Sequence, residues 1–397
     1  MGSAPLAGLR VLELARILAG PWIGQTLADL GADVIKVESP SGDDTRRWGP
    51  PFVEYGDGGR DAAYFHSANR GKRCIIADFT TSEGQEEVRR LAATADVLIE
   101  NFKVSGLRQY GLDFSSLSAI NPRIIYCSIT GFGQDGPLAQ KPGYDFIVQG
   151  MSGMMDVTGD PEGEPQKIGV ALADILTGLY GVIGIQAALL QRQGTGRGQH
   201  IDMALYDVMV GVLANQALNY LVSGNAPTRM GNKHPNIAPY EVFPAADGWV
   251  ILAVGNDAQF TRLCTVLGIP EDPKFASNAD RVMHRESLSG KITKMTQIRA
   301  RDELLSAFAA AGVPAGPINT IAQAFKDPQI IHRGLVLDLE TKDGNGTVPG
   351  VRTPIKFSEA SLCLDMAAPR HPKSSGKRTS QIDWIALNHE KDAPKNG

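Results

Sequence analysis

Short apolar runs alternate with amphipathic stretches through the first 130 residues. The apolar runs at 10–15, 33–39, 73–79, 96–101 and 123–130 have the length and composition of buried strands. Between them, 20–31, 82–95 and a stretch ending near residue 120 carry apolar residues at helical spacing. This alternation predicts an α/β fold with a parallel sheet and helices on both faces. Ligands bind such sheets at the carboxyl ends of the strands, so the loops after these strands are the first candidates for a site.

The pattern changes after residue 170. Residues 170–222 resemble two long apolar helices broken by a turn at 192–200, and a polar stretch rich in Gly and Pro follows at 223–239. Residues 240–255 are typical of a hairpin with Asp247-Gly248 at its turn, and a second hairpin is expected at 335–351. We therefore expect a large domain in 1–222, a linker with a smaller α+β domain in 223–320, and a return segment in 321–397 that completes the large domain.

Composition narrows the class of protein. The 397 residues are 43% hydrophobic and 21% charged with a net charge of −4, which favours a globular protein over a nucleic-acid binder. The four cysteines form no CxxC pair and the histidines show no metal-ligand spacing, so neither a disulfide framework nor a metal site is expected. We find no leader-like start and no apolar run of about 20 residues. A cytoplasmic protein with no membrane segment is the expectation.

The segment "GFGQDG" at 131–136 matches the pattern G-x-G-x-x-G directly after a strand-like run. A dinucleotide fingerprint must open a helix whose N-terminus faces the pyrophosphate. Here Pro137 and Pro142 bracket a stretch without helical periodicity. The pattern therefore predicts a loop and not a nicotinamide or flavin site.

One carboxylate interrupts the apolar stretch "GVALADILTGLYG" at 169–181. Helical spacing places Asp174 on a face with small residues, and the opposite face holds residues expected to be buried in the core: Leu172, Ile175, Leu176 and Leu179. A helix start near Ala171 would put Asp174 in the first turn, where the helix dipole should lower its pKa and keep it ionised at pH 7. Spacing alone leaves two interpretations open: a carboxylate that satisfies helix-end N–H groups, or a reactive group.

Two loops concentrate cations. "SPSGDDTRRWGPP" at 39–51 contains Arg46 and Arg47, and "NRGKR" at 69–73 holds three cations in five residues. Both could bind an anion, although such runs are also typical of solvated turns and exposed faces.

The ordered motifs together resemble the class III CoA-transferases, also called the CaiB/BaiF family. The matching segments are "LAGLRVLELARILAGPWIGQTLADLGADVIKVESPSGDDTR" (6–46), "ANRGKR" (68–73), "ADVLIENF" (95–102), "SITGFGQDGP" (128–137), "GYD" (143–145), "GVALADILTGLYG" (169–181) and "GTGRGQHIDMALYD" (194–207). The resemblance implies a Rossmann-like large domain, a smaller domain and an interlocked homodimer. It also implies coenzyme A and acyl-CoA as substrates, with no permanently bound cofactor.

The resemblance assigns the catalytic role to Asp174. Its carboxylate would attack the thioester of a donor acyl-CoA, expected to be succinyl-CoA, and CoA would pass to a small dicarboxylic acid through aspartyl anhydride and aspartyl-CoA intermediates. A small-domain loop shields these intermediates in the family. The matching segment here, "VGNDAQF" at 254–260, retains Gly255, and Gln259 is the candidate polar contact.

The resemblance also implies contacts to coenzyme A. The residues carried over by motif are Leu18, Ala19, Asn69, Arg70, Lys72, Asn101, Phe102, Tyr144 and Asp145, with Arg108 as a candidate for an arginine that the family places in the loop after 96–101. Within the family, several segments are similar to the dicarboxylate branch. A second carboxylate needs a cation, for which the candidates are Arg46, Arg47 and His234.

Two alternative functions remain beside the transferase. Acyl-CoA racemases or epimerases of the same family use the histidine of a Gly-His-Asp motif, whereas this chain has Tyr144 at that position. Losing an imidazole removes a proton-transfer group that titrates near neutrality, which favours the transferase. The other alternative is a CoA-binding protein without turnover.

Overall fold

The computed structural model describes residues 3–341, 346–372 and 382–385. The chain forms two compact units, and each is described by itself. Unit one comprises Met1–Gly153, Ile168–Ala217 and Ile331–Gly397, and unit two comprises Met154–Lys167 and Leu218–Ile330. The segment 154–167 thus groups with the second unit, whereas the sequence pattern places it in the large domain. The Arg229 guanidinium accounts for part of this grouping, because it bonds the carbonyls of Asp156 and Asp160.

A six-stranded parallel sheet forms the centre of unit one. Its order is β5-β2-β1-β6-β7-β8, made of β1 (Arg10–Glu13), β2 (Asp33–Glu38), β5 (Arg73–Ile76), β6 (Val97–Glu100), β7 (Ile125–Thr130) and β8 (His200–Ala204). Numbered by position in the chain, this is the doubly wound order 3-2-1-4-5-6, with the direction of winding reversed between β1 and β6. The predicted α/β fold is confirmed.

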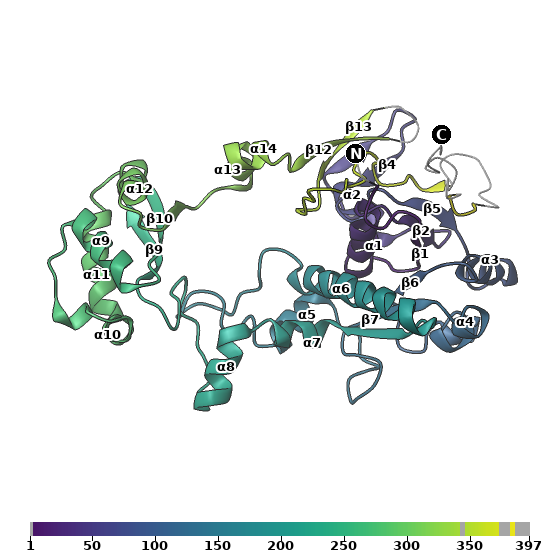
Figure 1. The fold of residues 1–397 in the computed structure, drawn as a ribbon, viewed down its shortest axis with the longest axis horizontal. Helices are drawn as coiled ribbons and strands as arrows, with labels where there is room; N and C mark the ends of the chain where they lie inside the picture. The colour runs from purple at the N-terminus through teal and green to yellow at the C-terminus, as the bar shows by residue number, and fades with distance from the viewer. Residues whose placement is uncertain (1–2, 342–345, 373–381, 386–397) are drawn as a thin grey trace, which may run out of the picture. The chain divides into compact units, whose positions relative to one another are not determined.

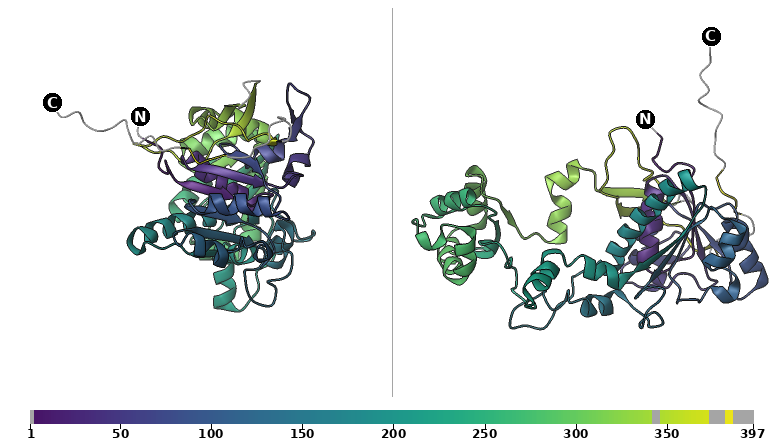
Figure 2. Two further views of the ribbon diagram at one scale, coloured as in Figure 1. Left: turned by 90° about the vertical axis from the view of Figure 1, so that its right-hand side faces the viewer. Right: turned by 60° about the horizontal axis from the view of Figure 1, so that its bottom comes forward.

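Helices cover both faces of this sheet (Figures 1 and 2). On one face lie α1 (Ala19–Asp29) and α6 (Leu172–Thr195), and on the other lie α3 (Ser82–Ala92) and α4 (Phe114–Ile120). Short elements complete the connections: η1 (Asp44–Arg47), β3 (Phe52–Glu54), β4 (Arg60–Ala62), α2 (Ala63–His66), η2 (Arg108–Tyr110), α5 (Asp145–Met151), α7 (Leu205–Gly211) and α8 (Ala214–Ser223).

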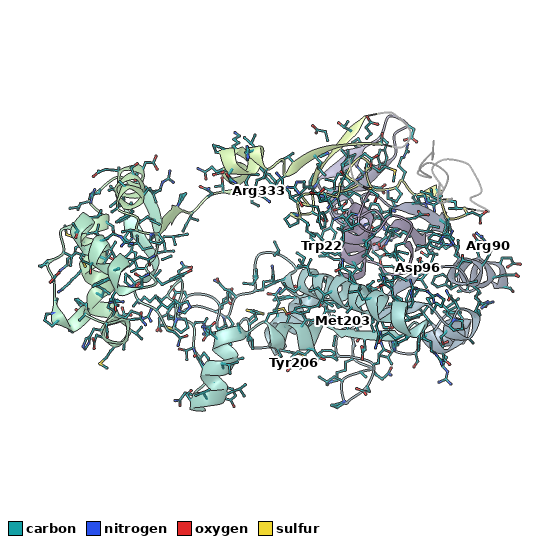
Figure 3. All side chains as sticks on the ribbon, in the orientation of Figure 1. Trp22, Arg90, Asp96, Met203, Tyr206 and Arg333 are labelled. Carbon is teal, nitrogen blue, oxygen red and sulfur yellow. The ribbon has the colours of Figure 1, made fainter. Side chains whose placement is uncertain are left out.

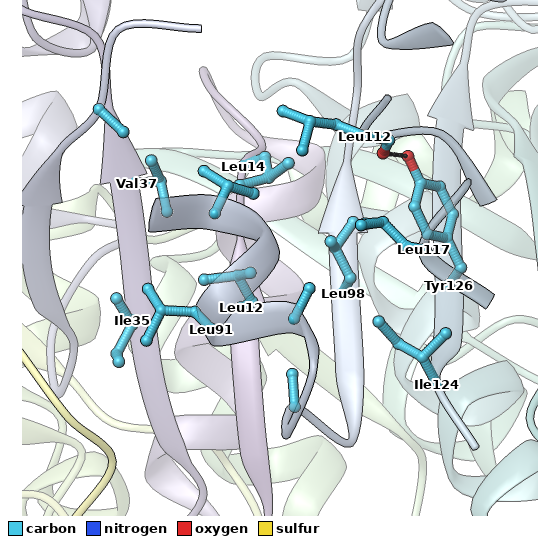
Figure 4. Packing of buried hydrophobic residues seen from close by; sticks show 14 of the residues in the cluster. Leu12, Leu14, Ile35, Val37, Leu91, Leu98, Leu112, Leu117, Ile124 and Tyr126 are labelled. Atoms are coloured by element: carbon cyan, nitrogen blue, oxygen red, sulfur yellow. Dashed lines mark hydrogen bonds between the residues drawn. The ribbon is translucent and has the colours of Figure 1, made fainter. Parts of the chain in front are cut away.

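The face under α3 and α4 holds an apolar core (Figure 4). Leu12 and Ile35 from the sheet pack with Leu91 of α3 and Leu117 of α4, and all four are fully buried or nearly so. The hydroxyl of the buried Tyr126 donates a hydrogen bond of 2.9 Å to the Leu112 carbonyl. This core fixes the strands whose carboxyl ends carry the site.

Helices α1 and α6 pack closely because α6 presents glycines to α1. A Cβ added at Gly178 would lie 3.0 Å from the Ala19 carbonyl oxygen and 3.1 Å from Trp22, which is labelled in Figure 3. At Gly181 a Cβ would overlap the Ile23 side chain. The small face of α6 therefore serves helix packing. The predicted leucine face is wrong as a core face of this chain, since Leu172, Ile175 and Leu176 are only partly buried and Leu179 is 41% exposed.

The second predicted long helix is also wrong at its start. Residues 200–204 form β8, whose backbone pairs with β7 from Tyr126 to Thr130. A short strand at a sheet edge needs few apolar residues, because only one neighbour covers it. Its five residues, HIDMA, alternate polar and apolar, but the run is too short to be told apart from the start of the helical stretch that follows.

Unit two has its own sheet and core. The antiparallel strands β9 (Tyr240–Ala245), β10 (Gly248–Ala253) and β11 (Ala315–Pro317) confirm the hairpin predicted around Asp247-Gly248. They pack with α9 (Asp257–Leu267), η3 (Pro273–Phe275), α10 (Asn278–Met283), α11 (Arg285–Thr296) and α12 (Arg301–Ala310) around a buried apolar cluster. Two further helices follow, α13 (Ile321–Lys326) and α14 (Pro328–His332).

The chain then returns to unit one. The predicted second hairpin is confirmed by β12 (Val336–Glu340) and β13 (Thr347–Val351), which pair antiparallel. Beyond it, the Cys363 N–H bonds the Asp29 carbonyl, and the Met366 carbonyl accepts from Gly71. The segment after the hairpin thus contacts α1 and the loop before β5.

By length and composition alone, α6 could cross a membrane, and it is the one helix in the described residues that could. This differs from the expectation that no apolar run is long enough. The same helix packs on α1 and carries Asp174, as a core helix would.

Candidate active site

A pocket of about 580 Å³ lies at the carboxyl edge of the large sheet. Its walls come from the loops that follow β1, β2, β5, β6 and β7, and from the first turn of α6. It therefore includes the point between β1 and β6 where the winding reverses, which is where doubly wound sheets bind ligands. The predicted residues that line it are Ala19, Asn101, Phe102, Tyr144, Asp145 and Asp174.

Asp174 lies in the first turn of α6, as predicted, but another acid caps that helix. The Asp145 carboxylate accepts the N–H of Ala173 at 2.7 Å and, more weakly, the N–H of Asp174 at 3.3 Å. In the part of the chain that the structure describes, the Asp174 carboxylate has no hydrogen-bond partner. The carboxylate that accepts the helix-end N–H groups is therefore that of Asp145 and not that of Asp174.

The electrostatics of Asp174 correct the sequence prediction. Burial and the Asp145 carboxylate raise the pKa of Asp174 from 3.8 to about 7. The predicted lowering by the helix dipole is wrong because Asp145 occupies the N–H groups through which the dipole acts, and its negative charge disfavours a second one. Asp174 is thus near half ionised at neutral pH and becomes a better nucleophile as pH rises.

The loop between β7 and α5 places Asp145. Two glycines close this loop, since a Cβ at Gly131 would lie 2.5 Å from the Gly143 Cα. The Tyr206 N–H bonds the Gly131 carbonyl at 3.0 Å, and the Tyr206 side chain is labelled in Figure 3. The segment 131–136 opens no helix, so its prediction as a loop is confirmed. Its glycines bring the backbone chains together where Asp145 must reach α6.

Gln149 fixes the orientation of the Asp145 carboxylate. Its side-chain amide donates to Asp145 at 2.7 Å, and its side-chain carbonyl accepts the Ile168 N–H at 3.0 Å. Gln149 is fully buried, so these bonds are shielded from water. The second carboxylate of the site is thereby held in one position beside Asp174.

Asn101 and Phe102 shape the wall of the pocket after β6. The Asn101 side chain accepts the Arg16 N–H at 2.9 Å and donates to the Arg16 carbonyl at 2.6 Å. The Arg16 guanidinium lies 5.6 Å from the centre of the Phe102 ring. Leu18, by contrast, is the N-cap residue of α1, is 6% exposed and does not line the pocket.

Asn69, Arg70 and Lys72, which are predicted to contact coenzyme A, do not line the pocket. All three are buried. The Arg70 guanidinium pairs with Asp29, and the Lys72 ammonium pairs with Glu13 at 2.8 Å and bonds the Asn69 side chain. Arg70 and Lys72 are thus paired with carboxylates inside unit one, where an unpaired charge would be costly.

Arg46 and Arg47, two of the cations predicted to bind a second carboxylate, also lie outside the pocket lining. Arg46 is buried and paired with Glu38 at 2.6 Å and with Asp61 at 2.8 Å. Arg47 is exposed and bonds Asp44 at 3.0 Å. Neither lines the pocket.

Three candidates lie in unit two. The Gln259 side-chain carbonyl accepts the Gly255 N–H at 2.8 Å at the start of α9. The His234 ring accepts from the Asn236 N–H at 3.1 Å and packs on Tyr240 at 5.2 Å. Gly255 and Gln259 thus form one local turn, and their role toward the intermediates stays a prediction.

Cations that the sequence analysis did not select line the pocket. They are Arg16, Lys103 and Lys141, all of them exposed. Position alone could have identified them, since each follows a strand of the sheet in a loop at its carboxyl edge. Gln109 also lines the pocket, whereas Arg108 lines a neighbouring cavity of about 240 Å³ with Glu100 and His200.

Tyr64 is a further residue that the motifs did not indicate. Burial and the charges of Asp174 and Asp145 raise its pKa to about 12, so the phenol stays neutral. Its ring meets Trp48 edge-on with centroids 5.3 Å apart. A neutral phenol in the field of two carboxylates can serve as a hydrogen-bond donor.

Metal chemistry has no candidate ligand set in the described ranges 3–341, 346–372 and 382–385. No group of three or more His, Cys, Asp and Glu side chains there is arranged to hold a metal ion. The four cysteines are free.

We expect Asp145→Asn to move the acid limb of the activity profile. The amide keeps an acceptor for the Ala173 N–H but removes the charge that helps raise the pKa of Asp174, while burial still acts on it. The acid limb of kcat/KM against pH should therefore shift down by up to about one unit. Gln149→Met, which disturbs the same bonds without removing a charge, should leave the limb in place; an equal shift in both variants would contradict the electrostatic cause.

Comparison with known proteins settles the family. A model of CoA-transferase family III matches residues 6–374. The succinate–glutarate CoA-transferase of Agrobacterium fabrum is 57% identical over 386 residues, which cover 96% of both chains. The human succinyl-CoA:glutarate CoA-transferase is 39% identical over 95% of this chain and 85% of its own. A crystal structure of a CaiB/BaiF family protein from Brucella suis superposes with a TM-score of 0.84 at 61% identity, over 95% of this chain and 98% of that one. The resemblance is confirmed: this chain belongs to CoA-transferase family III and is an acyl-CoA:carboxylate CoA-transferase.

Proposed function

We propose that this enzyme transfers CoA from succinyl-CoA to glutarate, with Asp174 as the nucleophile. The observation that carries the proposal is the position of Asp174, whose carboxylate lines the pocket without a hydrogen-bond partner in the described chain. The names of the relatives from Agrobacterium fabrum and human support the pair of substrates.

The proposed reaction uses only carboxylates and the thiol of CoA. The Asp174 carboxylate attacks the thioester carbonyl of succinyl-CoA, which forms a mixed anhydride and releases the CoA thiolate. The thiolate attacks the aspartyl carbonyl, and succinate leaves. Glutarate then attacks the aspartyl-CoA thioester to give a second anhydride, from which the returning thiolate takes the glutaryl group and frees Asp174. Each intermediate is activated, so the thioester energy is retained as long as water is excluded.

Three cations are suited to the phosphates of coenzyme A. Arg16, Lys103 and Lys141 line the same pocket as Asp174, and charge-assisted bonds to phosphate are stronger than neutral ones. Replacing Lys141 with Ala should raise the KM for succinyl-CoA more than it lowers kcat, which steady-state kinetics can measure. An unchanged KM would remove Lys141 from this role.

A homodimer is also part of the proposal. Large apolar side chains that would be costly to leave in water lie exposed in unit one: Phe146, Ile147, Leu179, Tyr180, Ile183 and Leu190. These residues lie on α5 and α6. The helices that carry Asp145 and Asp174 would therefore lie at the dimer interface. An interlocked dimer could bring Gly255 and Gln259 of the shielding loop to the site. Light scattering after size-exclusion chromatography measures the state, and a monomer would exclude it.

The experiment that tests the proposed function is an acceptor screen. The enzyme is incubated with succinyl-CoA and one of several acids, and acyl-CoA products are identified by mass. We expect glutaryl-CoA as the main product and ¹⁴C exchange between succinate and succinyl-CoA. A different acyl-CoA as the main product would mean that another acid, and not glutarate, is the acceptor. Binding of CoA without exchange would indicate a non-catalytic protein. Deuterium uptake at the α-carbon without any acceptor would indicate a racemase instead.

A further inference from the structure

Ile17 has a backbone conformation that its side chain disfavours. Its φ is 71°, in the left-handed region where a β-branched residue is rare and strained. Ile17 lies between the end of β1 and the start of α1, and it lines the same pocket as Asp174. Strain of this kind persists only where surrounding structure holds it, and it concentrates at functional sites.

A buried ion pair holds the backbone on both sides of Arg16. The Asp43 carboxylate accepts the Ile17 N–H at 3.3 Å, and the Lys36 ammonium donates to the Ala15 carbonyl at 2.8 Å. Lys36 and Asp43 are 3.0 Å apart and fully shielded from solvent. The two members of one ion pair thus bond the Ala15 carbonyl, which precedes the strained turn, and the Ile17 N–H within the turn.

Other contacts keep this pair in place and ionised. Thr45 donates to Asp43 through its N–H at 3.0 Å and its hydroxyl at 2.8 Å, and Lys36 also pairs with Glu13 at 3.1 Å. Burial disfavours both charges, but the carboxylates around Lys36 raise its pKa, and Lys36 and Thr45 lower the pKa of Asp43. The pair therefore does not titrate away near neutral pH.

We propose that the Lys36–Asp43 ion pair is a positioning device that holds Ile17 in its left-handed conformation and so sets the pocket wall of Arg16, Ile17 and Ala19 for reaction at Asp174. This inference rests on the proposed function, because it assigns the strain a role in that reaction. The pair contacts no pocket surface itself: neither Lys36 nor Asp43 lines the cavity. Both are positioning residues that act through the backbone of the loop.

Glycine at position 17 separates positioning from general stability. Glycine adopts a left-handed φ without strain, so it should keep the turn in place when the ion pair is weakened. We expect Asp43→Asn to lower kcat about 100-fold, the scale for a small displacement of a wall near reacting atoms. Adding Ile17→Gly to Asp43→Asn should then recover at least about tenfold of that loss. Losses that simply multiply, or a wild-type kcat for Asp43→Asn, would overturn the proposal.

A control removes another ion pair of unit one, which is partly exposed to solvent. Asp33 pairs with Arg73 at 2.6 Å at the amino end of β2, away from the pocket. Asp33→Asn should lower Tm without changing kcat, and Ile17→Gly should not rescue its Tm. If Asp43→Asn does not fold, Thr45→Val removes one hydroxyl bond to Asp43, and a smaller kcat loss should again be rescued by Ile17→Gly.

Hydrogen exchange tests, without measuring activity, whether the Lys36–Asp43 ion pair holds the backbone at Ile17; this restraint is called the clamp below. In Asp43→Asn the amides of residues 15–18 should exchange faster than in the wild type, while Asp33→Asn leaves them unchanged. If the wild type transfers no CoA between succinate and glutarate, the proposed function fails while this measurement still decides on the clamp. Unchanged exchange at 15–18 would overturn the clamp even if the wild type is an active transferase.

Discussion

Replacing Asp174 with Asn or Ala is expected to abolish CoA transfer, with a loss on the order of 10⁴-fold or more. The amide matches the shape of the carboxylate but cannot form the anhydride, so both half-reactions stop at the first step. Because the Asp174 carboxylate accepts no hydrogen bond from the described residues, its removal leaves no buried donor unpaired. The measurements are the acyl-CoA products, identified by mass, and the covalent adduct on the enzyme after incubation with succinyl-CoA. The Ala variant is included because Asn can deamidate to Asp and so restore activity.

The control is another first-turn acid. Asp207 occupies the first turn of α7, is exposed and lies outside the pocket, so Asp207→Asn should retain wild-type transfer. Substantial transfer by folded Asp174→Ala would rule out the nucleophile and with it the proposed intermediates.

The same substitution should stabilise the protein at alkaline pH. The pKa of Asp174 is raised in the folded state, so the native protein holds its proton more tightly than the unfolded chain. Its unfavourable charge is half present at about pH 7, nearly complete about one unit higher, and absent below about pH 4. Asp174→Asn should therefore gain about 4 kcal/mol in free energy of unfolding at pH 8 and close to nothing at pH 4, as denaturant unfolding can measure. A gain that is equal at both pH values would place its cause elsewhere.

Gly24→Ala is expected to cost about 4 kcal/mol or more of stability. A Cβ on this α1 residue would overlap the Glu13 carboxylate, which is fully buried and paired with both Lys36 and Lys72. Glu13 cannot move aside without leaving two buried ammonium groups short of a partner. We expect a large fall in the yield of folded protein and in the midpoint of urea unfolding.

Gly184→Ala is the matched control within α6. A Cβ there would make an ordinary contact of 3.5 Å with the Ile201 side chain. In a helix interior, alanine is more favourable than glycine. This variant should gain about 0.5–1 kcal/mol. A comparable loss in both variants would mean that the Glu13 cluster does not account for the cost at Gly24.

Strand positions in unit one followed directly from the sequence because buried parallel strands are continuous apolar runs. Five of the six strands of the large sheet coincide with predicted runs, and the hairpin at 240–255 was announced by its turn. The missing strand, β8, is a short edge strand that pairs with β7 and with no other strand among the described residues. Pairing with a distant segment, and not local composition, makes it a strand.

The site divides in the same way. Motif resemblance identified Asp174 and five pocket residues, because family motifs record which side chains meet at the active site. It also selected the cations at 70 and 72, which the fold pairs with Asp29 and Glu13. The sequence does not reveal whether folding brings a carboxylate next to a given cation. A cation buried in an ion pair therefore cannot be told apart, in the sequence, from a cation exposed in the pocket.

The sequence by itself determined the family, the parallel sheet and the place of Asp174 in the first turn of α6, since all three depend on local pattern and order. The tertiary structure alone decided the state of that carboxylate. Asp145, 29 residues earlier in the chain, accepts the helix N–H groups, and the Asp174 carboxylate is left without a hydrogen-bond partner among the described residues, with its pKa raised to about 7. The physical reason is that a pKa depends on burial and on charges brought close by folding, and neither is encoded by spacing along one helix.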